Sequence, residues 1–296
     1  MNFIPIIFHP VYGFIKKDDE NKFISKNGFL KKNLENIGLL SNKNLYCPNP
    51  IDKKSILNIH SNSYVYKVFN NELTRKELRV IGLKPFSFFK ERSVISAGGT
   101  FLSSKLALKN GIAFNLAGGS HHAFESYGAG FCIFNDVAIA VRKLLLSKKI
   151  KKALILDLDV HQGDGNAKIF SNDNNVFTVS LHCNDNYPFS KSKSDLDIGF
   201  KKGTGDTEYL YKLDKTLEKL QKIDFDIIFY IAGVDVHYKD KLGLLKITEE
   251  GIFRREKRII NFVKKRNIPL VVTLGGGYND NLKFLADLHT FIFKSI

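Results

Sequence analysis

Short apolar runs alternate with longer amphipathic stretches along the last two thirds of the chain. The runs are rich in β-branched and aromatic residues, which is typical of strands buried on both faces of a parallel sheet. The stretches between them have the length and periodicity of helices. Buried strands are expected at 4–8, 112–117, 153–156, 176–182, 227–233 and 270–274.

Several of the intervening helices have recognisable limits. Asn135 or Asp136 would cap the helix before the third strand, and Pro269 would stop the helix before the last one. Helices are expected at about 98–109, 137–146, 207–222 and 249–265, and at the end of the chain.

The first third of the sequence is less informative. It contains weakly amphipathic stretches at 28–40 and 72–81 and a turn at 47–50. We expect His60 to be solvated at a helix end rather than to lie at the rim of a site. Since no repeat or linker divides the chain, we predict one α/β domain over 1–296, with a mostly parallel central sheet in a three-layer α/β/α arrangement.

Polar residues and glycines follow directly after five of the expected strands. In a parallel sheet, the carboxyl ends of the strands meet at one edge, where such folds bind their ligands. The motifs therefore predict an active site at that edge. They are His121 and His122, Asp157 to Asp164, Ser180 to His182, Asp235, and Gly275 to Tyr278.

The motif after the third strand has the residue types of a metal site. In an extended segment Asp159 and His161 point to the same side and can share one ion, with Asp157 supporting them from behind. Aspartate oxygen with imidazole nitrogen suits Zn²⁺ or Fe²⁺ with a position left open for water, and Asp235 would complete the set. The alternative interpretation is a polar loop with a capping aspartate.

The same residues suggest a reaction. A metal held by two carboxylates is a mild Lewis acid, so Tyr278, on a flexible glycine loop, would help by donating to a substrate carbonyl. A histidine beside the metal can take a proton from water and return it to a leaving amine. Asp157 and Asp164 would orient the two imidazoles. This combination indicates metal-assisted hydrolysis of an amide.

Six motifs, in order, resemble the histone deacetylase family. The compact length, the Gly98-Gly99-Thr100 segment and the His161-Gln162 pair are most similar to the class IV branch and its bacterial relatives. The resemblance implies the arginase–deacetylase fold and a zinc hydrolase that acts on acylated amines. The motifs are Gly-Gly-Ser-His-His-Ala at 118–123, Gly-Phe-Cys at 130–132, Asp-Leu-Asp-Val-His-Gln-Gly-Asp-Gly at 157–165, Ala-Gly-Val-Asp at 232–235, residues 240–248, and Gly-Gly-Gly-Tyr at 275–278.

Matching positions in the family imply roles for the site residues. The resemblance makes His122, paired with Asp164, the general base and acid, and His121, paired with Asp157, an electrostatic partner. Tyr278 would polarise the acyl carbonyl. The implied zinc ligands are Asp159, His161 and Asp235. The implied structural potassium site, largely backbone oxygens, is Asp157, Asp159, His161, Ser180 and Leu181.

The family also implies a tunnel for acyl-lysine. Phe131 would form one wall, and Gly130 and Gly276 would also contact the substrate. Where many deacetylases carry an aromatic residue after the strand-end histidine, this chain has Cys183-Asn184-Asp185-Asn186, and Tyr187 is the nearest ring. No residue can be matched to the family's rim aspartate. We therefore expect a wider or differently closed tunnel, with acylated lysine or a small acylated amine as substrate.

Composition excludes other classes of protein. The formal net charge of +15 comes from lysines scattered along the chain, so specific nucleic-acid binding is not expected. No apolar run is long enough for a membrane span. The three cysteines form no CxxC pair, which suggests a reducing compartment, and no signal peptide is recognisable. We expect a cytoplasmic protein; its oligomeric state is not indicated.

Two other functions are possible for a chain with these motifs. A two-metal, arginase-like ureohydrolase needs additional bridging carboxylates, but Val236 and His237 follow Asp235. A catalytically silent protein that binds acyl-lysine would keep the pocket but lack part of the machinery. Nothing essential is missing, which argues against it.

Overall fold

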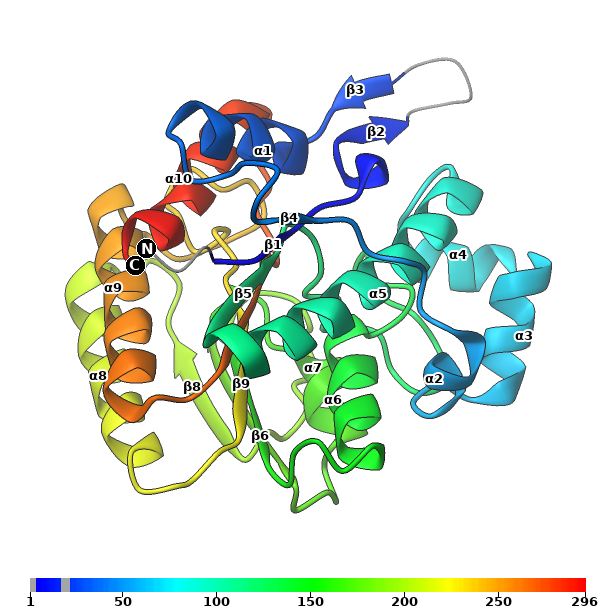
Figure 1. Cartoon of the computed structure of the whole chain (residues 1–296). Helices are drawn as coiled ribbons and strands as arrows, with labels where there is room; N and C mark the ends of the chain where they lie inside the picture. Colours follow the sequence, from blue (N-terminus) through cyan, green and yellow to red (C-terminus); the bar gives the residue numbers. More distant parts are fainter. Residues whose placement is uncertain (1–3, 17–21) are drawn as a thin grey trace.

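Eight strands form one parallel sheet through the centre of the molecule (Figure 1). The computed structural model describes residues 4–16 and 22–296. Each pair of neighbouring strands in this sheet is parallel. In spatial order the strands are β4 (Leu45–Tyr46), β1 (Ile6–Ile7), β5 (Ile112–Asn115), β10 (Leu270–Thr273), β9 (Ile227–Ile231), β6 (Ala153–Asp157), β7 (Val176–Cys183) and β8 (Leu196–Phe200).

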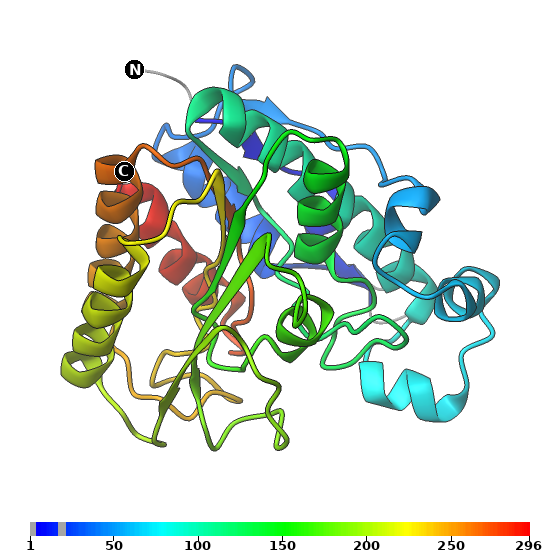
Figure 2. The ribbon, with the colours of Figure 1, turned by 90° about the horizontal axis from the view of Figure 1, so that it is seen from below.

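Helices cover both faces of the sheet and complete a single three-layer α/β domain. Figure 2 shows the helices of the C-terminal third, in yellow to red, on one side and the teal and green helices on the other. The first layer contains α1 (Lys26–Asn36), α8 (Asp206–Leu220), α9 (Glu249–Arg266) and α10 (Leu282–Lys294). The second contains α2 (Lys53–Leu57), α3 (Asn62–Asn70), α4 (Arg75–Ile81), α5 (Phe86–Asn110), α6 (Asp136–Leu146) and α7 (Asp164–Ile169). A short antiparallel pair, β2 (Phe14–Lys16) with β3 (Lys22–Ile24), and a 3₁₀ turn at Pro10–Tyr12 lie outside the layers.

The continuous apolar runs arise because the strands are buried on both faces. In β6, Leu154 and Leu156 belong to the core beneath α8 to α10, whereas Ala153 and Ile155 belong to the core beneath α5 and α6. Successive side chains of a strand point to opposite faces, so both sets must be apolar. The predicted strands and the α/β class are therefore confirmed.

Two predicted helix limits also hold. The side chain of Asn135 accepts a hydrogen bond from the backbone N–H of Ala138 at 2.8 Å and caps α6. Helix α9 ends at Arg266, and Asn267 adopts a left-handed conformation before the Pro269 region. Polar side chains that accept from free N–H groups stabilise helix starts, and left-handed residues end helices without strain when they are Asn or Gly.

The predicted start of the helix at 98 is wrong, because α5 begins twelve residues earlier, at Phe86. Gly98 lies inside the helix and packs against the loop before α2. A Cβ atom there would lie 1.9 Å from the carbonyl oxygen of Asn49. The glycine therefore marks a close approach of two backbones and not a helix terminus.

The expectation of a solvated His60 is also wrong. The side chain is 1% exposed; its Nδ1 atom lies 2.9 Å from the carbonyl oxygen of Phe124, and its Nε2 atom accepts from the backbone N–H of Asn135 at 3.0 Å. Burial lowers the pKa of His60 to about 4. A neutral imidazole thus ties the α2–α3 region to the loop before α6.

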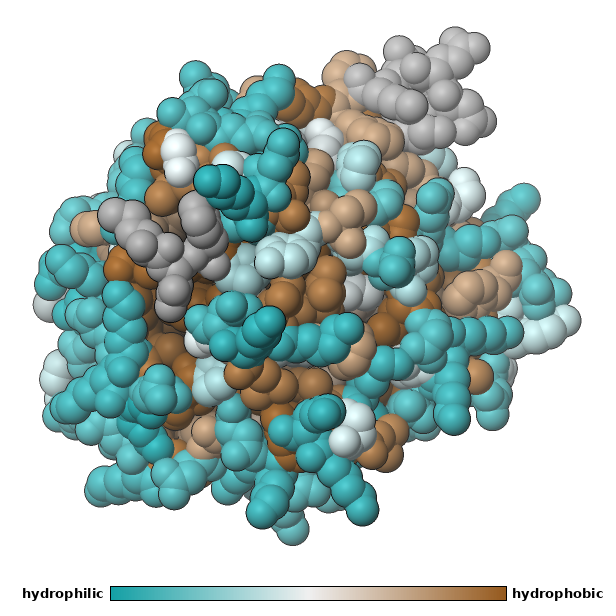
Figure 3. Space-filling view, viewed as in Figure 1, coloured by the Kyte–Doolittle hydropathy of each residue, from teal (hydrophilic) through white to brown (hydrophobic). Residues whose placement is uncertain are grey.

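The surface is mostly hydrophilic over the outer helices, including α8 and α9 on the left of Figure 3, and apolar areas are interspersed. Among the described residues, no helix combines the length and hydrophobicity that a bilayer crossing requires. The cysteines are unpaired, with Cys132 and Cys183 buried and Cys47 exposed.

Replacing Gly98 by alanine should lower the free energy of unfolding by about 1–3 kcal/mol, because the added methyl group forces α5 away from the Asn49 carbonyl. Lys109→Ala, at an exposed position of the same helix, is the control and should change stability by no more than about 0.5 kcal/mol. Urea unfolding followed by circular dichroism measures both. Equal stabilities of the two variants would contradict the close packing.

Candidate active site

Three side chains from two adjacent strand ends converge on one buried point. Asp159 and His161 follow β6, and Asp235 follows β9. Each offers a donor atom, and these atoms lie within 4.8 Å of one another. The Nδ1 atom of His161 is 3.1 Å from Oδ1 of Asp159 and 3.2 Å from Oδ2 of Asp235. Two carboxylates and an imidazole in this arrangement can hold one divalent metal ion.

Backbone N–H groups fix the two carboxylates. Asp159 accepts from the N–H of Gly276 at 2.7 Å and from that of His161 at 3.0 Å. Asp235 accepts from the N–H of Val160 at 2.9 Å. These hydrogen bonds hold both carboxylates in place before any metal binds, so metal binding has less side-chain conformational entropy to remove.

The electrostatics of the cluster favour a bound cation. Burial and the neighbouring Asp159 carboxylate raise the pKa of Asp235 to about 7. Burial opposes the charged form of His161, but the two carboxylates outweigh it and raise its pKa to about 10. A divalent ion would offset both negative charges, so the donor set and its charge fit Zn²⁺ or Fe²⁺.

Glycines are required where loops from two strands touch these acids. A Cβ atom on Gly276 would lie 1.9 Å from Oδ2 of Asp235, and one on Gly233 would lie 2.5 Å from Oδ2 of Asp159. No larger side chain fits without moving a carboxylate. The glycine run after β10 thus allows the backbone to approach the cluster closely.

Two neighbouring histidines lie beside the cluster and bind different acids. His121 Nδ1 is 2.7 Å from Oδ2 of Asp157, and His122 Nδ1 is 2.6 Å from Oδ1 of Asp164. Both imidazoles are nearly buried, and their ring centroids are 4.0 Å apart. The pairing is the one expected from the sequence.

The two imidazoles differ in charge. Burial works against protonation of His121, but the carboxylates of Asp157 and Asp159 prevail and raise its pKa to about 9. Burial and the charge of His121 lower the pKa of His122 to about 4, although Asp164 acts in the opposite direction. Near neutral pH, His121 is a cation and His122 is a free base.

The loop that carries the histidines is held by Asp136, at the start of α6. Its carboxylate accepts from the backbone N–H groups of Gly119 and Ser120 at 3.2 and 2.7 Å and from the Thr100 hydroxyl at 2.5 Å. Asn135 is the cap of α6, which leaves Asp136 free for this task.

A hollow of about 410 Å³ is lined by His122 and by His161. Phe131 and Tyr187 both line it, and the ring of Tyr187 meets His122 edge-on, with centroids 5.0 Å apart. Gly130 packs against the same imidazole. Tyr187, the ring nearest in sequence to the missing aromatic position, therefore lines the hollow together with Phe131.

Tyr278 forms the inner end of this hollow. Its ring centroid is 6.1 Å from that of His161 and 5.8 Å from that of Phe131. Its backbone N–H donates to Asp240 at 2.6 Å. Burial raises the pKa of the phenol well above its ordinary value, so the hydroxyl keeps its proton.

A family model for the histone deacetylase domain matches residues 24–292. The chain belongs to the histone deacetylase family. It is 39% identical over 293 residues to an uncharacterized protein of Picosynechococcus sp., covering 98% of this chain and 97% of the relative. It is 33% identical over 277 residues to Histone deacetylase 2 of Arabidopsis thaliana, covering 89% and 71%. The crystal structure of an HDAC homologue from Aquifex aeolicus has the same fold, with a TM-score of 0.78 at 22% identity, covering 98% of this chain and 84% of that one.

The structure brings most of the residues chosen from the sequence to this histone deacetylase-like site. Ser180 and His182 instead face each other, with Oγ and Nδ1 3.0 Å apart, and neither belongs to the three-residue cluster. Ser180 lies opposite Asp157 in the sheet, and Leu181 follows it. The residues brought together are His121, His122, Gly130, Phe131, Asp157, Asp159, His161, Asp164, Asp235, Gly276 and Tyr278.

The sequence interpretation missed Arg255. This side chain is fully buried in α9 and donates to the carbonyl oxygens of Gly233 at 2.8 Å and Leu158 at 3.2 Å. These carbonyls belong to the segments that carry Asp235 and Asp159, so one guanidinium fastens both. Its charge is paired with that of Glu256.

A signal for this arginine was present in the sequence. Ile252, Ile259 and Ile260 mark the buried stripe of α9, and the helical period places Arg255 and Glu256 on that stripe. A charged pair on an apolar face indicates a buried partner. Asp136 and Asp240 carry no comparable signal, because partners such as Thr100 and the backbone N–H of Tyr278 lie far away in the sequence.

Arg255→Met should reduce the free energy of unfolding by about 3–5 kcal/mol, because it leaves the Glu256 carboxylate buried without its partner. Arg258→Met is the matched control. Arg258 lies three residues after Arg255 in α9 and is paired with the half-exposed Asp214, so this variant should lower the free energy of unfolding by less than about 1 kcal/mol. Urea unfolding measures both. A loss as small as that of the control would show that the buried pair contributes little.

Proposed function

We propose that this histone deacetylase-family hydrolase removes acetyl or longer acyl groups from an acylated lysine in a peptide or protein, or from a small acylated amine. The observation that carries the proposal is a neutral histidine and a charged histidine beside a buried two-carboxylate, one-imidazole cluster. The neutral histidine, His122, and the imidazole of the cluster, His161, line a hollow that also carries aromatic side chains. A base, a positive charge and a set of metal ligands together can support metal-assisted hydrolysis of an amide.

The proposed zinc ligands are Asp159, His161 and Asp235. A zinc ion bound there would polarise the acyl carbonyl and lower the pKa of water. Asp157, together with Ser180, Leu181 and the backbone of the ligand segment, is proposed to hold a structural potassium ion. The register that places Asp157 opposite Ser180 supports that second site.

His122 is proposed to act as the base and then as the acid. Its low pKa leaves it unprotonated near neutral pH, and Asp164 holds its Nδ1 side, so that Nε2 is available to take a proton from the attacking water. The same nitrogen can return this proton to the leaving amine. His121, kept protonated by Asp157, supplies a positive charge beside the reacting atoms.

Tyr278 is proposed to donate a hydrogen bond to the acyl oxygen. Its hydroxyl stays protonated because desolvation and the nearby carboxylates of Asp159 and Asp235 raise its pKa, and Asp240 fixes its backbone. The bond would strengthen as negative charge develops on the oxygen. Phe131 and Tyr187 would enclose the aliphatic stem of the acylated side chain, with Gly130 and Gly276 providing close backbone walls.

The ureohydrolase alternative gains no support from the described residues, in which one three-residue cluster of this kind occurs. His237, where a second bridging acid would be needed, faces Glu249 at 3.3 Å. The proposed base, metal ligands and tyrosine all lie close together at the site, which argues against a silent binding protein.

Turnover should be measured with zinc-loaded protein on one peptide that carries acetyl-, butyryl-, hexanoyl- or longer acyl-lysine, and on acetylated polyamines. Release of the free amine from at least one substrate is expected. If zinc is bound but no substrate is hydrolysed, the deacylase proposal is wrong, and tight binding of a hydroxamate under those conditions would favour the silent binding protein.

Asp235→Asn should weaken zinc binding by at least roughly 100-fold, because losing a ligand must cost more than losing an outer hydrogen bond. Competition with a chromogenic chelator measures the affinity, and elemental analysis of the wild type should give about one zinc ion per chain. Asp214→Asn, at an exposed acid of α8, is the control. Unchanged affinity in Asp235→Asn would remove this residue from the metal site, and two tightly bound manganese ions would favour the ureohydrolase.

Tyr278→Phe should lower kcat by on the order of 10²-fold, the usual effect of removing one donor to a developing oxyanion. Zinc affinity should stay close to that of the wild type, since the phenol is not a proposed ligand. Tyr211→Phe, at an exposed position of α8, provides the control for a lost hydroxyl. Wild-type turnover in Tyr278→Phe would exclude the hydroxyl from the reaction.

A further inference from the structure

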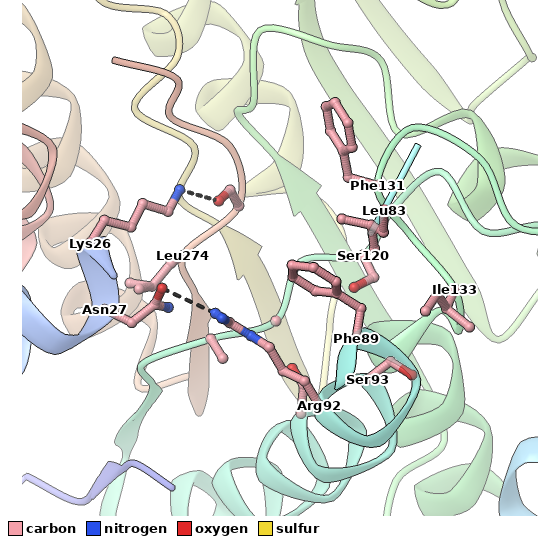
Figure 4. A pocket seen from close by; sticks show the side chains of 14 residues that line it. Lys26, Asn27, Leu83, Phe89, Arg92, Ser93, Ser120, Phe131, Ile133 and Leu274 are labelled. Atoms are coloured by element: carbon pink, nitrogen blue, oxygen red, sulfur yellow. Dashed lines mark hydrogen bonds between the residues drawn. The ribbon is translucent and has the colours of Figure 1, made fainter. Parts of the chain in front are cut away.

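A cavity of about 150 Å³ lies beside Phe131, whose ring centroid is 5.8 Å from that of Tyr278 (Figure 4). One wall is apolar and carries Leu83, Phe89 and Phe131. Lys26 and Asn27 occupy the opposite side, and the guanidinium of Arg92 extends from α5 towards them. The cavity therefore combines an apolar surface with two cationic groups.

The cavity adjoins the proposed reaction centre. Gly275 lines it, and a Cβ atom on this glycine would lie 3.1 Å from Oδ2 of Asp159. Phe131 lines both the cavity and the outer hollow, and a neighbouring hollow of about 470 Å³ shares Lys26 and Arg92 and adds Tyr278. An acyl chain that passes the reaction centre would thus meet the cationic side.

Within the described part of the chain, the hydrogen bonds of both cations go to neutral acceptors. Lys26 Nζ donates to the carbonyl oxygen of Gly275 at 3.0 Å, and Arg92 donates to Asn27 Oδ1 at 3.1 Å and to the carbonyl oxygen of Phe14 at 3.4 Å. Within residues 4–16 and 22–296, neither cation lies within 4.0 Å of a carboxylate oxygen. Burial lowers the pKa of Lys26 to about 8, against the attraction of Asp235 and Asp159, and lowers that of Arg92 to about 10.

Lys26 and Arg92 are half-buried, so each loses part of its hydration without gaining a carboxylate partner, and a bound anion would compensate for that loss. Asp159 and Asp235 attract Lys26 from a distance, but a divalent ion at their cluster would take up most of their charge. The guanidinium is suited to bidentate contact with a carboxylate, and the ammonium adds a second charge-assisted hydrogen bond. The apolar wall suits the methylene groups that would precede that carboxylate.

We propose that this cavity binds the free carboxylate of a dicarboxylic acyl group, so that the preferred substrates are amides such as succinyl- or glutaryl-lysine. This inference rests on the proposed deacylase function. The reaction is plain hydrolysis: the amide C–N bond breaks, water gives its hydroxyl to the acyl carbon and a proton to the amine nitrogen, and a dicarboxylate is released without any oxidant or reductant.

The first experiment compares one peptide carrying glutaryl-lysine with the same peptide carrying 5-methylhexanoyl-lysine, which has the same shape but no charge. Zinc-loaded full-length protein should prefer the glutaryl peptide by at least roughly tenfold in kcat/KM, the scale of one buried charge-assisted contact. Hydrolysis of neutral acyl peptides without this preference would overturn the inference and leave the deacylase function standing. No hydrolysis of any acyl peptide would overturn both.

The second experiment follows the ratio of the two kcat/KM values in variants of α5. Arg92→Leu should lower the glutaryl preference by roughly tenfold or more, and Arg92→Lys should keep part of it. Lys90→Leu, two residues away and bound to Asn71, is the control and should leave the ratio unchanged. A ratio that does not differ between Arg92→Leu and the control would contradict the assignment.

A binding measurement on the wild type does not depend on the folding of any variant. Glutarate should raise the Tm of the zinc-loaded protein more than 5-methylhexanoate does at the same concentration, because both can reach the metal through one carboxylate but only glutarate offers a second to the cavity. Equal shifts would count against a carboxylate subsite.

Discussion

Two carboxylates buried side by side are the constraint on which the rest of this structure depends. Asp235 is fully buried and Asp159 nearly so, and like charges in such a place repel each other and lose their hydration. The protein counters this with backbone N–H groups from Gly276 and Val160 and with the imidazole of His161. The remaining negative charge is what makes the cluster suitable for a divalent ion.

The need to bring donors so close explains the architecture around the cluster. Because β6, β9 and β10 are parallel, their carboxyl ends lie at the same edge of the sheet. Only glycine, however, allows the loop after β10 to come close to Asp159 and Asp235. Arg255 then holds the two ligand segments from the side of α9 through their carbonyl oxygens.

The sequence predicted the sheet well because burial on both faces leaves a local signature. The run at 153–156 is apolar at every position and the run at 270–274 at every position except Thr273, and the structure places both in the middle of the sheet. The start of α5 was missed because Gly98 has its reason in a contact with Asn49, far away in the sequence. His60 was misjudged for the same reason, since its partners are Phe124 and Asn135.

The same distinction between local and distant contacts separates the site residues that were predicted from those that were missed. Residues that follow strands were found because position and chemistry coincide, as for Asp159 and Asp235. Tyr187 was recognised as the nearest ring, but its contact with His122 depends on the path of the loop after β7, which no periodicity describes. Lys26 was not predicted, because it starts a helix in the first third of the chain and donates to the carbonyl oxygen of Gly275, far away in the sequence.

The paired histidines show how the fold gives different properties to identical neighbours. Because adjacent side chains at the end of a strand diverge, His121 reaches Asp157 behind the cluster, while His122 reaches Asp164 at the start of α7. His121 is also attracted by Asp159, and its resulting charge in turn disfavours protonation of His122. The positive charge on one imidazole thus keeps the other available as a base. The distribution of buried acids, and not the residue type, sets this division.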